Sequence, residues 1–117
     1  MSREQSIAAV EAYLECFTTK DPSNLPFAED VTFEGPRMPK LTGRSMVQGF
    51  LTHILPMVKS VQLKRNIVEG DYVATIFDME TVSGIDHVCD QIHIVDGKIK
   101  AIHAFYYPAE PPATQST

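Results

Sequence analysis

Three turn dipeptides divide the second half of the chain into four segments of similar length. The turns are predicted at Gly70-Asp71, Ser83-Gly84 and Asp96-Gly97, because such glycine-containing pairs favour short hairpin loops. The segments around them are rich in β-branched and aromatic residues and read as strands over about 60–69, 71–82, 86–95 and 98–107. Short loops join antiparallel neighbours, so this half of the chain is predicted to be an antiparallel meander.

The first half of the chain is predicted to be mainly helical. Apolar residues recur at helical spacing over about 4–19, behind a Ser2 to Gln5 capping-box pattern. Asp21-Pro22 favours a second helix of one or two turns, and a third is expected from about Thr42-Gly43 until Pro56 interrupts it. A short strand over 31–34 separates the last two. Helices followed by hairpins indicate an α+β fold, with helices packed on one face of a curved antiparallel sheet.

Length and composition narrow the class of protein. With 117 residues the chain is expected to form one domain over 1–108, followed by a flexible tail over 109–117. A net charge of −5 argues against binding to the phosphate backbone of nucleic acids. No apolar stretch is long enough for a membrane span, and two isolated cysteines make no disulfide framework. We therefore expect a cytoplasmic protein with no nucleic-acid or membrane partner.

Asp90 is the residue that points most directly to function. It lies within a strand-like run, on the same alternating face as Val88, Ile92 and Ile94. A carboxylate on an apolar face is costly because desolvation penalises the charged form. Ligand sites accept that cost more readily than structural cores do. A buried structural pair with a nearby tyrosine or backbone group is the alternative interpretation.

Three sequence strings, in this order and spacing, resemble the nuclear transport factor 2-like superfamily: 27–36 (FAEDVTFEGP), 41–44 (LTGR) and 95–99 (VDGKI). The nearest branches are the SnoaL-like polyketide cyclases and the ketosteroid isomerases. The resemblance implies a cone-shaped, cystatin-like fold whose curved sheet and helices enclose one pocket. It also implies a small hydrophobic ligand, no cofactor, and a homodimer formed through the outer sheet face.

Residue by residue, the ketosteroid isomerases match this sequence at two positions and differ at a third. Tyr13 falls where that family has its oxyanion-hole tyrosine, and Asp90 where it has an aspartic acid kept protonated to donate a second hydrogen bond. The family's general base precedes the proline of the first strand, and that position is Gly35 here. Loss of a general base costs on the order of 10²–10⁴ in rate, which argues against steroid isomerisation itself.

The role of His103 depends on the hairpin at Asp96-Gly97. A two-residue turn pairs Asp90 with His103 and gives an Asp–His dyad, making His103 a third catalytic candidate. A three-residue loop with a bulge pairs Asp90 with Ile102 instead and turns His103 to the outer face. The family resemblance favours the second register.

A set of further residues is predicted to surround the ligand. The resemblance places the Asp78 and Glu80 side of its strand at the pocket mouth, although alternation alone suggests a solvated face. No histidine or cysteine spacing indicates a metal site. The predicted ligand-binding residues are Phe17, Phe33, Phe50, Asp78, Ile92, Ile102, Ala104 and Tyr106.

Two functions remain open from the sequence. One is a cofactor-free acid–base enzyme, of the isomerase or cyclase type, acting on an apolar carbonyl-bearing ligand through Asp90 and Tyr13. The other is a non-catalytic ligand-binding or dimerisation module of the same fold, because fold alone does not determine function.

Overall fold

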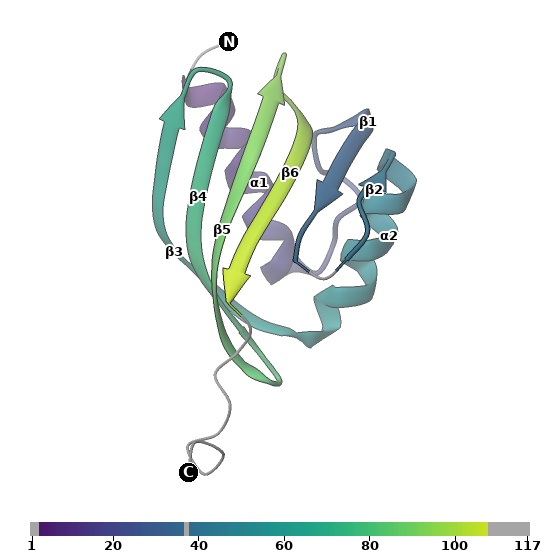
Figure 1. The fold of residues 1–117 in the computed structure, drawn as a ribbon, viewed down its shortest axis with the longest axis vertical. Helices are drawn as coiled ribbons and strands as arrows, with labels where there is room; N and C mark the ends of the chain where they lie inside the picture. Colours follow the sequence, from purple (N-terminus) through teal and green to yellow (C-terminus); the bar gives the residue numbers. More distant parts are fainter. Residues whose placement is uncertain (1–2, 37, 108–117) are drawn as a thin grey trace.

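The computed structural model describes residues 3–36 and 38–107. One six-stranded sheet, in the order β2-β1-β6-β5-β4-β3, curves around two helices (Figure 1). The predicted capping-box residue Ser2 and the predicted tail 109–117 lie outside the described residues. The elements are α1 (Arg3–Thr19), β1 (Phe27–Glu34), β2 (Leu41–Thr42), α2 (Arg44–Ile54), the 3₁₀ turn η1 (Leu55–Met57), β3 (Val58–Glu69), β4 (Tyr72–Thr81), β5 (Gly84–Val95) and β6 (Lys98–Tyr107).

Helix α1 forms as its apolar periodicity predicts. Its buried side chains recur at helical spacing, from Ser6 through Val10, Tyr13 and Phe17. The helix ends where Lys20 adopts a left-handed conformation, with φ of 64°, and its backbone N–H donates to the Cys16 carbonyl. Because this one helix covers strands β3, β4 and β5, it decides which sheet residues are enclosed.

The predicted second helix is wrong. After Lys20 the chain forms turns, and it enters β1 already at Phe27, before the predicted strand start. The Asp21 carboxylate accepts hydrogen bonds from the backbone N–H of Ser23, at 3.0 Å, and from the Ser23 hydroxyl. Such a side-chain cap stabilises a turn as readily as a helix start, and Pro26 leaves no room for a second helical turn.

Helix α2 confirms the other predicted helix. Gly43, with a φ of 99° that suits glycine, precedes its first residue. The helix buries Val47 and Leu51, and it gives way to η1 one residue before Pro56. The Arg44 guanidinium anchors its start by donating to the Phe27 carbonyl at 3.0 Å.

The antiparallel meander from β3 to β6 is confirmed, with turns at Gly70-Asp71 and Asp96-Gly97 as predicted. The middle turn lies one residue earlier than predicted, at Val82-Ser83, because Gly84 already pairs with Thr81. The last hairpin has a two-residue turn in which Asp96 and Gly97 both have positive φ, 52° and 76°. Ile94 pairs with Ile99 but His93 pairs with Ala101, so Lys100 is an extra residue on β6. This bulge gives a register that matches neither predicted alternative.

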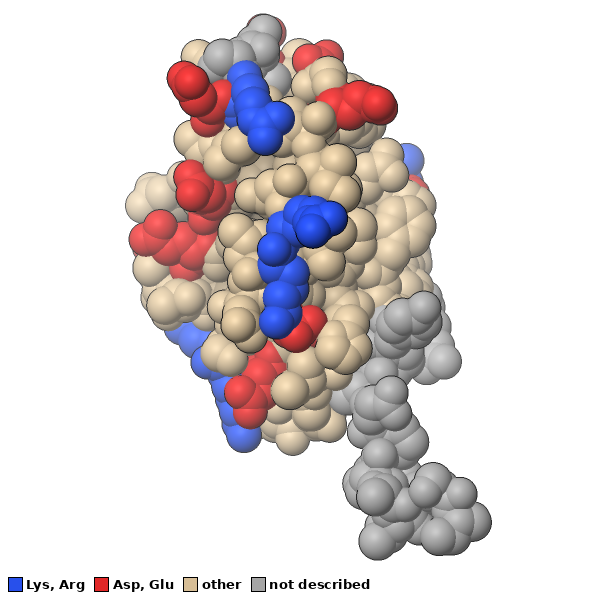
Figure 2. Space-filling view, turned by 90° about the vertical axis from the view of Figure 1, so that its left-hand side faces the viewer, with Lys and Arg blue, Asp and Glu red and all other residues tan. Residues whose placement is uncertain are grey.

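The sheet has two different margins. At one margin, β1 pairs parallel with β6 and antiparallel with the short strand β2, which forms the edge. In the chain, β2 and α2 follow β1 and lead into the meander. At the other margin β3 is an exposed edge, and Figure 2 shows Lys, Arg, Asp and Glu side chains on that side of the molecule. Charges and the two register shifts of β3 are ordinary protection against edge-to-edge pairing. None of the described helices is long and apolar enough to cross a membrane.

Candidate functional site

A cavity of about 720 Å³ opens between the concave face of the sheet and the two helices. Its walls are mainly apolar and include Phe17 of α1, Phe33 of β1, Phe50 of α2 and Phe77 of β4. Polar groups concentrate at two places: Tyr13 and Asp90 line one, and the β4–β5 turn with Ser83 lines another. The arrangement of apolar walls with a few polar groups is typical of small-molecule sites.

Tyr13 and Asp90 meet within this cavity, as predicted. The Tyr13 hydroxyl donates to Asp90 Oδ2 at 3.0 Å, and each side chain is 2% exposed. Alternation along β5 places Asp90 on the inner face with Val88 and Ile92, where α1 covers it. Among the described residues, Asp90 Oδ1 has no hydrogen-bond partner.

Burial changes the proton affinity of both groups. Desolvation raises the pKa of Asp90 to about 7, although the hydrogen bond from Tyr13 acts in the opposite direction. The pKa of Tyr13 is raised well above its ordinary value, first by burial and then by the Asp90 charge. Tyr13 therefore remains a neutral donor, while Asp90 is populated in both protonation states near neutral pH.

The predicted dyad of Asp90 with His103 is wrong. The bulge at Lys100 shifts the register, so Asp90 lies opposite Ala104, and His103 lies opposite Gln91 on the outer face. There the His103 ring stacks on Phe105 at a centroid distance of 4.3 Å, and its Nδ1 lies 3.6 Å from Glu34 Oε1. Its imidazole cannot act in the cavity from this position.

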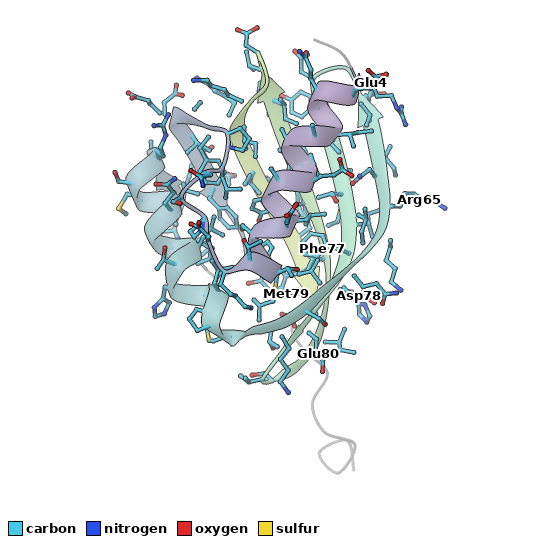
Figure 3. The ribbon with its side chains drawn as sticks, turned by 180° about the vertical axis from the view of Figure 1, so that it is seen from behind. Glu4, Arg65, Phe77, Asp78, Met79 and Glu80 are labelled. Atoms are coloured by element: carbon cyan, nitrogen blue, oxygen red, sulfur yellow. The ribbon has the colours of Figure 1, made fainter. Side chains whose placement is uncertain are left out.

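Asp78 is also outside the cavity, contrary to the prediction. Its carboxylate lies 2.8 Å from His87 Nδ1 and 3.7 Å from Lys64 Nζ on the outer face. These contacts, with the His87 hydrogen bond as the largest cause, lower the pKa of Asp78. Figure 3 labels Phe77, Asp78, Met79 and Glu80 on this strand, and Phe77 and Met79 are the two that line the cavity.

The predicted ligand-binding residues divide into cavity wall and core. Phe17, Phe33, Phe50, Ala104 and Tyr106 line the cavity. Ile92 and Ile102 do not, because they pair with each other across β5 and β6 and are fully buried in the core.

Several lining residues were missed by the sequence reasoning. Alternation from Asp90 along β5 leads to Val88 and Asp86, and alternation along β4 leads to Phe77, Met79 and Thr81, so this signal was present in the sequence. The remainder of the wall comes from loops and helix ends, whose approach to the sheet has no local sequence signal. These residues are Pro36, Met38, Ile54, Met57, Val58, Val82 and Ser83.

Gly35 follows the last residue of β1, beside the cavity. A side chain built there would place its Cβ 3.4 Å from Met38 Sδ and 3.6 Å from Ala104 Cβ, both cavity residues. Ala104 is the cross-strand partner of Asp90. The position at which the ketosteroid isomerases carry their base is therefore next to the cross-strand partner of Asp90, and it has room for a small side chain.

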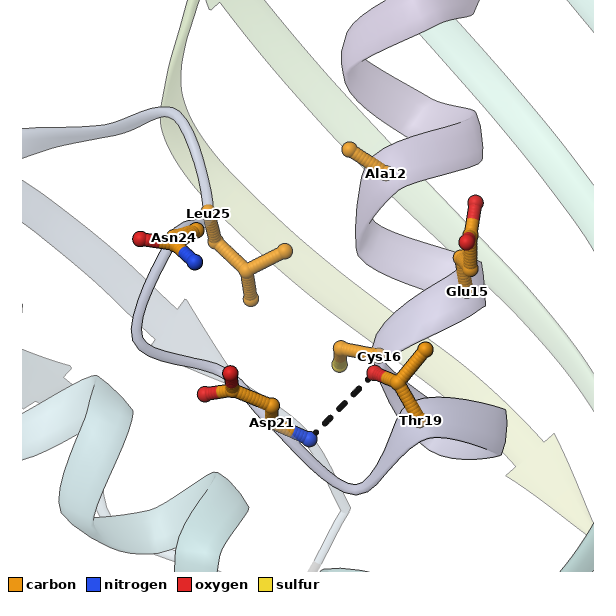
Figure 4. A pocket seen from close by; sticks show the side chains of 7 residues that line it. All are labelled: Ala12, Glu15, Cys16, Thr19, Asp21, Asn24 and Leu25. Atoms are coloured by element: carbon orange, nitrogen blue, oxygen red, sulfur yellow. Dashed lines mark hydrogen bonds between the residues drawn. The ribbon is translucent and has the colours of Figure 1, made fainter.

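A second, smaller hollow of about 330 Å³ lies at the C-terminal end of α1, beside Cys16, Asp21 and Leu25 (Figure 4). Burial, followed by the Asp21 charge, raises the pKa of the Cys16 thiol to about 12, so this thiol is not activated as a nucleophile. The described residues contain no group of three His, Cys, Asp or Glu side chains that could hold a metal ion.

Known proteins share this architecture. A SnoaL-like domain model matches residues 10–102. A de novo designed protein with a curved β-sheet is 23% identical, with a TM-score of 0.83 over 92% of this chain and 89% of that one. A steroid delta-isomerase from Pseudomonas aeruginosa is 20% identical, with a TM-score of 0.75 over 89% and 80%.

An LEH-like epoxide hydrolase from M. tuberculosis is 20% identical, with a TM-score of 0.73 over 89% of this chain and 84% of that one. No curated protein matches the sequence. Likeness at these identities shows the fold alone. The family match covers most of the chain. The protein therefore belongs to the SnoaL-like domain family of the nuclear transport factor 2-like superfamily.

Proposed function

We propose that this protein is a cofactor-free acid–base enzyme, of the isomerase or cyclase type, that acts on an apolar ligand bearing a carbonyl group. The observation that carries the proposal is the Tyr13–Asp90 pair, which lines an apolar cavity of about 720 Å³. A buried acid with a strongly shifted pKa in a cavity is a recognised mark of a functional site. The family and its isomerase and epoxide hydrolase neighbours support this class of chemistry.

The chemistry follows from the two groups at the cavity wall. Tyr13 stays protonated. When Asp90 is protonated, its O–H can donate to the Tyr13 oxygen, and the Tyr13 hydroxyl then turns from Asp90 Oδ2 to donate to the ligand oxygen on which negative charge develops. Asp90 acts as the acid when protonated and as a base when ionised, and a pKa of about 7 supplies both forms near neutral pH. Tyr13 and Asp90 are each 2% exposed, and their low-dielectric surroundings strengthen both interactions.

Binding and turnover of a panel of steroid-like and polyketide-like carbonyl compounds test the proposal. Asp90→Asn preserves the shape of the side chain but removes its titration, so turnover is expected to fall by about 10²–10⁴. Asp78→Asn is the matched control, because its carboxylate lies on the outer face. If the wild type turns over no compound in the panel, or if Asp90→Asn turns over the compounds as fast as the wild type does, the enzymatic proposal fails.

Gly35 supports a second candidate, a non-catalytic ligand-binding module. The cavity carries Asp90, but the position next to its cross-strand partner Ala104 has no side chain. Under this alternative the carbonyl compounds bind, and Asp90→Asn changes affinity while no variant changes a reaction rate.

Gly35→Asp distinguishes the two candidates by restoring a carboxylate. The new Cβ meets only the flexible Met38 thioether and the Ala104 methyl, at 3.4 and 3.6 Å, so the fold should tolerate it. We expect this variant to gain steroid isomerisation by about 10²-fold or more over the wild type, because a base then faces the cavity near the acid. A folded Gly35→Asp protein that binds a steroid but does not isomerise it would favour the binding module.

A further inference from the structure

Three buried oxygen atoms without partners lie in one row across the sheet. Thr75 of β4 pairs with Asn66 of β3 on one side and with Asp90 of β5 on the other. Asn66 Oδ1, Thr75 Oγ1 and Asp90 Oδ1 are all buried, and none has a hydrogen-bond partner among the described residues. They are three of only four such side-chain atoms in the part of the chain that the structure describes.

Three adjacent unpaired atoms call for one shared explanation, because buried polar atoms are paired in the great majority of cases. Adjacent strands lie about 4.8 Å apart, and side chains directly opposite each other have Cβ atoms about 5 Å apart. A single water molecule spans such a gap and needs two to four polar partners. A hydroxyl, an amide and a carboxyl can each donate or accept, according to protonation, and so meet a water in either role.

The row runs from the interior to the edge of the molecule. Thr75 is fully buried, Asp90 is 2% exposed, and Asn66 is half-buried on β3, the edge strand of the sheet (Figure 1). Helix α1 packs over strands β3, β4 and β5 and covers the row, and its Tyr13 occupies the other oxygen of Asp90. Thr75 and Asn66 are not part of the cavity wall, so this side of Asp90 is separate from the side that a ligand reaches.

We propose that Asn66 and Thr75 hold ordered water against Asp90 Oδ1, and that this hydrated row connects the acid to solvent at the β3 edge. Asp90 thereby keeps one oxygen solvated when a ligand fills the cavity. Thr75 is a positioning residue in this arrangement, since it acts on ligand chemistry only through Asp90. The proposal concerns the same acid as the proposed function but does not require that any reaction occurs.

Titration of Asp90 tests the row without a substrate. The carboxyl ¹³C shift of Asp90 is followed over pH in the wild type, Thr75→Val and Thr75→Ser. Thr75→Val keeps the shape of the side chain but removes the hydroxyl, and we expect the pKa of Asp90 to rise by about one unit as its charged form loses a hydrogen-bonded partner. Thr75→Ser keeps the hydroxyl and should restore the wild-type value.

The other titratable groups near Asp90 are unchanged in these variants. Tyr13 contacts Asp90 directly, Cys16 of α1 lies close enough to raise the pKa of Tyr13, and Cys89 precedes Asp90 on β5. A Thr75→Val protein whose Asp90 titrates as in the wild type would overturn the proposal, whatever the enzyme assays show.

A high-resolution crystal structure of the wild type supplies the second measurement. We expect ordered water within hydrogen-bond distance of Asp90 Oδ1 and Thr75 Oγ1, and water at the Asn66 amide. A direct Thr75–Asp90 hydrogen bond with no water between the strands would overturn the hydrated row. If the row is present but no carbonyl compound is turned over, the proposed function fails and this inference stands.

Discussion

Asp90 shows how burial and one hydrogen bond set the chemistry of a single residue. Desolvation raises its pKa to about 7, and the Tyr13 hydroxyl limits the rise by stabilising the charged form. The sequence placed Asp90 on an apolar face by alternation, and the family resemblance supplied Tyr13 as its partner. Neither source revealed Thr75, because a threonine on a strand has no pattern that marks its hydroxyl as unpartnered.

The stability of the protein should depend on pH through Asp90. The folded protein holds this proton more tightly than the unfolded chain, with pKa values of about 7 and 3.8. The contribution to the free energy of unfolding is therefore full below about pH 4 and is lost as pH rises through 7, a change of roughly 4 kcal/mol. Asp90→Asn does not titrate, so its stability relative to the wild type should increase over that range.

Urea unfolding of the wild type and of Asp90→Asn, at half-unit steps between pH 4 and pH 8, measures the difference in their free energies of unfolding. Asp78→Asn is the control, and its stability should change with pH in the opposite direction, because the pKa of Asp78 is lowered by His87 and Lys64. Its wild-type carboxylate stabilises the fold above its unfolded pKa and loses that effect as pH falls. Parallel stability curves for the wild type and Asp90→Asn would mean that Asp90 titrates normally.

Tyr13→Phe should raise the pKa of Asp90 further. The variant removes the hydroxyl that donates to Oδ2 and leaves the carboxylate without that charge-assisted bond. We expect a shift of about one unit, together with a loss of about 1–3 kcal/mol in stability at pH 8, where the carboxylate is ionised. Carboxyl ¹³C shifts and urea unfolding measure the two effects, and Tyr72→Phe, on the outer face, is the matched control.

At the level of secondary structure, the local signals predicted most of the elements correctly. The periodicity of α1, two of the three hairpin turns and the four strands of the meander follow from local residue patterns, whereas β1 begins earlier than predicted and β2 was not predicted. The failures occurred where local signals are ambiguous. Asp21-Pro22 suits a turn as well as a helix, and the bulge at Lys100 depends on how β6 must pair with both β5 and β1. That requirement involves three strands and cannot be read from one hairpin.

The type I′ turn should make Gly97 sensitive to substitution. Its φ of 76° is strained for any residue with a Cβ, so Gly97→Ala should lower the free energy of unfolding by about 1–2 kcal/mol. Gly49→Ala is the matched control, because Gly49 lies within α2 with open space around its Cβ position, and alanine should stabilise the helix by about 0.5–1 kcal/mol. Equal effects of the two substitutions in urea unfolding would contradict the turn assignment.

For the whole molecule, we expect self-association through the outer sheet face. Ile67, Tyr72 and Phe105 are each about half exposed on that face, which the helices leave uncovered. We expect a homodimer through this face, with about twice the chain mass of 13.0 kDa in light scattering. Phe105→Glu should give the monomer, whereas Met46→Glu, on α2, should remain dimeric. A wild-type mass near 13 kDa would refute the dimer.

The extra residue at Lys100 shifts the pairing of β5 with β6 by one residue for the remainder of the hairpin. Had β6 continued in step with its turn, His103 would stand where Ala104 stands, and an imidazole would sit beside the buried acid. Instead a methyl group occupies that place and opens space for a guest molecule. The bulge therefore places a small side chain, and not an imidazole, opposite the acid, so a β6 strand without the extra residue would have a proton acceptor in the cavity and less volume.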